Sequence, residues 1–157
     1  MKKIASSTAL CLALALLTTP AMARPVTITT KMKSYGGDGA YLAIYLTDAA
    51  GAYRRTLWVS GRKTRYWSHL SNWHRATRGS PPGVDAITGA SAGSGRTLTV
   101  TVDLADALID AGYQIRVDSA VEDDADRPAE VIAPLAANGR RRATAGRGFV
   151  QSLTYDF

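Results

Sequence analysis

The sequence is almost free of cysteine and histidine. Cys11 is the one cysteine among 157 residues, and it lies in the first apolar segment. A lone cysteine excludes an internal disulfide and a zinc site built from several thiolates. The two histidines, His69 and His74, are five residues apart and would lie on different sides of a helix, so we expect no shared metal site. No Ser-His-Asp or Cys-His set is recognisable, which favours a carrier or binding module over a stand-alone enzyme.

Long apolar runs are also missing beyond the first residues of the chain. The chain starts with Lys2-Lys3, continues through the uncharged segment 4–17, and then reaches the small-residue triplet Ala21-Met22-Ala23. This order is typical of a cleavable secretory signal, and the apolar part is shorter than the roughly 20 residues of a membrane span. We predict a signal peptide over 1–23, cleavage after Ala23, and one periplasmic or secreted domain over 24–157 that does not span a membrane.

The mature domain has little excess charge. Without Lys2 and Lys3, 17 basic residues stand against 13 acidic ones. Such a mild balance bears on solubility more than on partners. Together with export, it argues against nucleic acid as a partner.

Alternating apolar and polar residues predict strands along most of the mature chain. Asp48 and Gly51 indicate a tight turn between two of them, because Asp accepts hydrogen bonds from the following backbone and Gly adopts positive φ. Further strands follow, and the chain ends in a strictly alternating segment. The predicted strands are residues 26–30, 41–46, 52–60, 97–102, 112–121, 129–135 and 149–157.

Helical periodicity is clear in one segment only. Tyr66, Leu70 and Trp73 recur at i, i+4 and i+7, which predicts a helix over 64–77. Residues 103–110 are compatible with a shorter helix or with a turn. About seven strands, one short covering helix and no βαβ alternation predict an immunoglobulin-like antiparallel β-sandwich.

The segment Val84-Asp85-Ala86-Ile87-Thr88-Gly89-Ala90-Ser91 is the sharpest local motif. It resembles the site at which flavin transferases attach FMN to exported electron carriers: Asp, two free positions, Ser or Thr, Gly, Ala and a final Thr. Ser91 stands where that Thr is usual. The resemblance implies a phosphoester of FMN on Ser91, with Asp85, Thr88, Gly89 and Ala90 as the surrounding cofactor site. Neighbouring Gly, Pro and Ser residues favour an exposed loop. The alternative to modification is that Thr88-Gly89-Ala90-Ser91 is an ordinary turn that joins the helical region to the strand at Thr97.

Three charged segments remain. Residues 54–78 combine seven cations with four aromatic residues; they would suit a planar anionic ligand, or the aromatic side chains pack in the core while the cations are solvated. Residues 122–126 carry four acidic residues without the spacing of a known calcium loop, and we interpret them as a solvated turn. Arg140-Arg141-Arg142 predicts an exposed loop. A functional alternative is that this loop contacts anionic lipid or a partner.

A wider resemblance covers nearly the whole mature chain. It rests on the hairpin of residues 41–57, the tryptophan-containing segment 66–73, the segment 85–91 and the strand 112–117, in that order. In these features the chain resembles the exported family catalogued as domain of unknown function 2271. The resemblance implies a periplasmic immunoglobulin-like domain, often encoded near flavin transferases and membrane redox or metal-uptake proteins.

Two functions follow as expectations. The first is an exported redox carrier with FMN covalently attached at Ser91 by a flavin transferase, exchanging electrons with a membrane partner. The second is a non-catalytic module that assists a membrane redox or transport complex, using residues 54–78 or the end Tyr155-Asp156-Phe157.

Overall fold

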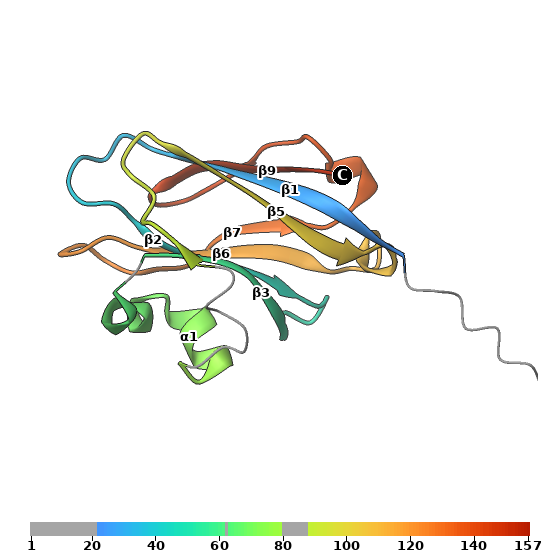
Figure 1. Cartoon of the computed structure of the whole chain (residues 1–157), viewed down its shortest axis with the longest axis horizontal. Coiled ribbons are helices and arrows are strands. Elements are labelled where there is room, and N and C mark those ends of the chain that lie inside the picture. The colour runs from blue at the N-terminus through green and yellow to red at the C-terminus, as the bar shows by residue number, and fades with distance from the viewer. Residues whose placement is uncertain (1–21, 62, 80–87) are drawn as a thin grey trace, which may run out of the picture.

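Two β-sheets packed face to face form the body of the protein (Figure 1). The computed structural model describes residues 22–61, 63–79 and 88–157. One sheet has the order β5 (Thr97–Ala105), β1 (Ala23–Met32), β9 (Val150–Asp156) and β8 (Thr144–Ala145). The other has the order β4 (Thr88–Gly89), β3 (Tyr53–Ser60), β2 (Tyr41–Thr47), β6 (Gln114–Ala120) and β7 (Arg127–Pro134). The predicted sandwich is confirmed, and all seven expected strands are present.

The turn between β2 and β3 forms as its residues dictate. Asp48 Oδ1 accepts hydrogen bonds from the backbone N–H of Ala50 (3.0 Å) and of Ala52 (2.9 Å). Gly51 adopts φ +83°, a conformation that glycine reaches without a Cβ clash. Arg54 adds an ion pair to the other Asp48 oxygen, so this end of the hairpin is closed by charge as well as by backbone.

The core between the sheets follows the alternation of the strands. Val26 and Ile28 of β1 and Leu153 of β9 are fully buried against inward residues of β2 and β6. The strand β2 differs from the others because all seven of its residues are buried. One face of β2 lies in the sandwich core. The other face is covered by the helical segment 64–77, which lies below this sheet in Figure 1.

The predicted helix over 64–77 is broken in the structure. A 3₁₀ helix, η1 (Thr64–His69), ends at Leu70, whose ψ of 65° is not helical, and the α-helix α1 (Ser71–Thr77) begins after it. Three residues per 3₁₀ turn bring Trp67 and Leu70 to one side, and Trp73 of α1 joins them in the same cluster, where all three are buried. The expected stripe was therefore wrong at Tyr66, which is only half-buried, and right at Leu70 and Trp73.

Short 3₁₀ turns connect some of the strands. Strand β5 extends to Ala105, and the 3₁₀ turn η3 (Asp106–Leu108) follows, so of the two alternatives for residues 103–110 the turn is closer to the structure than a short α-helix. Another 3₁₀ turn, η4 (Ala137–Gly139), precedes β8. Residues 1–21 of the predicted signal peptide lie outside the described residues. Within the described ranges, no helix is long and apolar enough to cross a membrane.

Candidate functional site

Ser91 lies at the surface, on a short segment that is attached to the sandwich on both sides. Before it, Thr88 and Gly89 form β4, which pairs in parallel with β3. After it, Ala92 forms an isolated antiparallel bridge with Ala40, with N···O distances of 2.7 and 2.9 Å in the two directions. Ala90 and Ser91 between these two attachments are exposed.

Gly89, just before this segment, is held by a backbone hydrogen bond and by contact with one bulky side chain. Gly61 N–H donates to Gly89 O at 2.9 Å, which extends the β3–β4 pairing by one residue. The indole of Trp58 covers the position that a Cβ on Gly89 would occupy. Glycine at 89 is therefore required by packing in this protein, independently of any role in a motif.

The Ser91 hydroxyl faces a glycine from a different part of the chain. A Cβ placed on Gly39 would come within 2.6 Å of Ser91 Oγ, so the absence of a side chain at 39 leaves the hydroxyl room. No described residue forms a hydrogen bond with Ser91 Oγ. Ser94, three residues later, is used differently, since its Oγ accepts from the backbone N–H of Tyr35 (3.0 Å) and Gly36 (3.1 Å).

A tyrosine holds the two loops around Ser91 together. The Tyr35 hydroxyl accepts from Ala40 N–H at 3.1 Å and lies 3.3 Å from Ala92 O, beside the bridge that follows Ser91. Burial is the main cause that raises the pKa of Tyr35, so the hydroxyl remains a protonated donor. The loop of residues 35–40 and the segment 90–94 are thus one connected unit.

The structure answers part of the sequence hypothesis for residues 85–91. Asp85 lies outside the described residues. Thr88 and Gly89 are half-buried in a strand, so the expected exposed loop was wrong for these two positions, because pairing with β3 and contact with Trp58 outweigh the local turn tendency. Ala90 and Ser91 are exposed as expected.

Most of the basic and aromatic segment 54–78 is engaged in internal contacts. Trp67 and Trp73 are buried with ring centroids 5.6 Å apart, and they line the second core cluster under β2. Lys63 and Arg65 lie over the ring of half-buried Tyr66 at 5.7 and 4.8 Å. For these residues the second interpretation is correct: the aromatic side chains pack, and the cations lie at the surface. Arg62 lies outside the described residues.

Two buried carboxylates were not singled out from the sequence. Asp118 accepts from the Tyr45 hydroxyl (2.9 Å) and from the backbone N–H of Trp73 (2.8 Å) and Ala129 (2.8 Å). Burial and the neighbouring Asp118 raise the pKa of Tyr45. Asp118 of β6 therefore connects the first turn of α1 to the sheet that this helix covers.

Glu130 plays a similar part at the other side of the sandwich. It accepts from the Ser119 hydroxyl and from the backbone N–H of Gly148 (2.8 Å) and Val150 (2.6 Å), joining β6 and β7 to the start of β9. The signal for both residues was an acidic side chain inside a predicted strand. Their partners come from distant segments, so their role was not visible along the chain.

The acidic segment 122–126 is more than a solvated turn. Tyr66 donates its hydroxyl to Glu122, and His69 Nδ1 lies 2.9 Å from Asp126 Oδ1, so the turn docks on η1. A hollow of about 290 Å³ lies beside it, lined by Tyr41, Tyr66 and residues 120–124. Among the described residues, no three His, Cys, Asp or Glu side chains are arranged to hold a metal ion.

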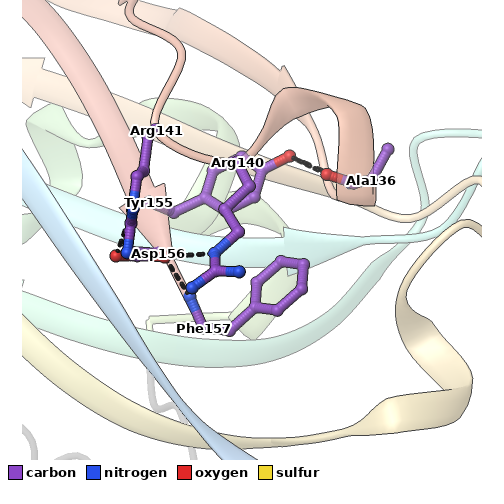
Figure 2. A network of polar contacts seen from close by, with 6 residues as sticks. All are labelled: Ala136, Arg140, Arg141, Tyr155, Asp156 and Phe157. Carbon is purple, nitrogen blue, oxygen red and sulfur yellow. Dashed lines mark hydrogen bonds and ion pairs between the residues drawn. The ribbon is translucent and has the colours of Figure 1, made fainter.

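The three arginines at 140–142 are exposed as expected, and two of them are fixed by the last strand. Asp156 pairs with Arg140 and, at 2.7 Å, with Arg141 (Figure 2). The hydrogen bonds from these two arginines lower the pKa of Asp156 to about 2. Next to them, the Tyr155 hydroxyl lies 2.7 Å from Ala136 O (Figure 2). A shallow hollow of about 480 Å³ opens here, beside Phe157.

Comparison with known proteins gives one match. The model of a family described as "Predicted periplasmic protein (DUF2271)" matches residues 23–152. No curated protein and no solved structure matches the chain.

Proposed function

The chain belongs to the DUF2271 family of predicted periplasmic proteins, and we propose that its function is to carry FMN on the Ser91 hydroxyl as an exported redox carrier. The observation that supports this proposal best is the position of Ser91. It is exposed, its hydroxyl forms no hydrogen bond within the described part of the chain, and Gly39 opposite it leaves space around the oxygen.

The attachment is a phosphoryl transfer at Ser91 Oγ. The serine oxygen forms a new bond to the FMN phosphorus of a nucleotide anhydride such as FAD, the P–O bond of the anhydride breaks, and AMP leaves. A serine hydroxyl is a weak nucleophile at neutral pH, so a base of the flavin transferase takes its proton. The bound group supplies reversible uptake of electrons from a membrane redox protein.

The residues before Ser91 position the hydroxyl and need not react. Thr88 and Gly89 hold the segment on β3, and the Ala92–Ala40 bridge holds its other side. A modifying enzyme therefore meets a short exposed segment, Ala90 and Ser91, whose two ends are held by the sandwich. Asp85 precedes this segment in the sequence and, in the proposal, contacts the transferase or its metal.

Intact-mass measurement tests the proposal directly. The mature protein is produced in the periplasm together with a flavin transferase, and we expect its mass to rise by one FMN less one water. Ser91→Ala should abolish the added mass, whereas Ser91→Thr, which introduces the residue usual in the flavin-attachment motif, should keep it.

Ser94→Ala is the matched control. It removes a hydroxyl three residues away that is already engaged by two backbone N–H groups, and it should leave the added mass unchanged. A wild-type protein without added mass, or equal flavin content in Ser91→Ala and wild type, would overturn the proposal.

A further inference from the structure

Strand β5 lies at an open edge of its sheet. It pairs with β1 along nine residues. The ladder begins with Thr97 opposite Lys31 and ends with Ala105 opposite Ala23. In the ranges that the structure describes, no strand pairs with its other side. An unpaired strand of this length presents a row of backbone donors and acceptors that another strand can use.

Two strands of the other sheet, the edge strand β7 and β3, which β4 covers only at Val59 and Ser60, are protected in ways that β5 is not. Strand β7 contains Pro128 and Pro134, and Ala129 has φ +46°, which bends the strand. The pairing of β3 with β2 shifts register twice, and β3 carries two exposed arginines. Between Thr97 and Val102, β5 has no proline, glycine or charge. Proteins commonly use such interruptions to block edge pairing, and β5 lacks them.

The side chains of β5 also show an incomplete edge. Two of its inward residues, Leu98 and Val102, are half-buried, although Val100 between them is only 6% exposed. On the neighbouring β1, Val26 and Ile28 are 0% exposed. Its outward residues Thr97, Thr99 and Thr101 are exposed. A strand added at this edge would cover the aliphatic side chains and continue the threonine row.

We propose that the partner at this edge is a second copy of the same strand, paired antiparallel across a two-fold axis. Threonine alternates with aliphatic residues over 97–102, so with Val100 at the axis Thr99 lies opposite Thr101 and Leu98 lies opposite Val102. No like charges are brought together within this segment.

Pairs of the required kind already exist on this sheet. Thr101 Oγ1 lies 3.0 Å from Thr27 Oγ1 across the β1–β5 ladder, and Thr99 pairs with Thr29 in the same register. Threonine pairs of this kind stabilise antiparallel strands. Just beyond the segment 97–102, Arg55 Nη1 donates to Asp103 O at 3.0 Å. The dimer would join two four-stranded sheets into one.

Sedimentation velocity of the mature protein over a wide concentration range tests this inference. We expect a concentration-dependent dimer that is lost in the double variant Thr99→Lys and Thr101→Lys. Like charges placed opposite each other should weaken the dimer on the order of tenfold or more. The control Gln151→Lys adds an exposed charge on β9, which is paired on both sides, and should leave the dimer unchanged.

A cross-link provides a second test that does not depend on weakening the protein. Signal cleavage would leave the protein without cysteine, so Thr99→Cys adds a single thiol. A short bis-maleimide should join two Thr99→Cys chains efficiently and two Gln151→Cys chains poorly. A wild-type monomer at every concentration, together with equal cross-linking of the two variants, would overturn the inference, as would an edge that binds only foreign extended peptides.

Discussion

Replacing Asp118 with alanine removes the acceptor of three donors at once, two of them buried and one, the Ala129 N–H, partly buried. The side chain is 0% exposed, and its two oxygens receive the Tyr45 hydroxyl and the backbone N–H groups of Trp73 and Ala129. Each buried donor left without a partner costs about 1–3 kcal/mol. Partial entry of water into the new space recovers some of this, so we expect Asp118→Ala to lower the free energy of unfolding by about 3–5 kcal/mol.

The conservative variant separates hydrogen bonding from shape. In Asp118→Asn, the amide oxygen can still accept from Tyr45 and Ala129, while the amide NH₂ faces the Trp73 N–H and replaces an acceptor with a donor. We expect a loss of about 1–2 kcal/mol, intermediate between wild type and the alanine variant.

Urea unfolding followed by tryptophan fluorescence measures both values, because Trp67 and Trp73 lie in the cluster that Asp118 anchors. Asp103→Ala is the control, since Asp103 is exposed on β5, and we expect a change within about 0.5 kcal/mol. If Asp118→Ala destabilised the protein no more than Asp103→Ala does, the hydrogen bonds assigned to Asp118 would not stabilise the fold.

Two further predictions concern backbone geometry and pH. Gly61→Ala should lower the free energy of unfolding by about 2–4 kcal/mol, because Gly61 has φ +107° and a Cβ there would collide with the Tyr41 ring; an unchanged urea midpoint would contradict this. The pKa of Asp156 is lowered from 3.8 to about 2, so its ion pairs stabilise the protein above about pH 3.8 and are lost as the pH falls through about 2. Asp156→Asn should therefore flatten the fall in Tm over that range, and an identical acid limb in the variant would refute this role.

The strands were predictable because alternation along the chain reports directly on the two faces of a sheet. The segment 41–46 carried apolar residues on both faces, and the structure supplies the reason: β2 is covered by the opposite sheet on one side and by η1 and α1 on the other. The turn at Asp48 was equally local, since its hydrogen bonds span only four residues.

The break at Leu70 was not predictable in the same way. Periodicity of 3.6 residues selected Tyr66, Leu70 and Trp73, whereas the 3₁₀ geometry of η1 selects Trp67 in place of Tyr66. The choice is made by tertiary contacts: the Trp67 indole donates to Gly61 O at 3.0 Å, and the Trp73 indole donates to Thr56 Oγ1 at 2.9 Å. Both acceptors lie outside the helical segment, so the segment's own residues do not encode the difference.

The proposed site illustrates the same limit for function. A pattern over residues 85–91 identifies a serine, but the space around its hydroxyl depends on Gly39, about fifty residues earlier in the chain, and on the Ala40–Ala92 bridge that brings the two segments together. An alanine at 39 would press on Ser91 Oγ without altering the motif at all. Since the turn at Ser91 is held from both sides, a flavin attached there would start from a fixed point on the sandwich, and its reach toward an electron partner would be set by its own phosphate and ribityl chain. Access to Ser91 thus depends on both segments, so a prediction that this serine is modified has to consider Gly39 together with the motif.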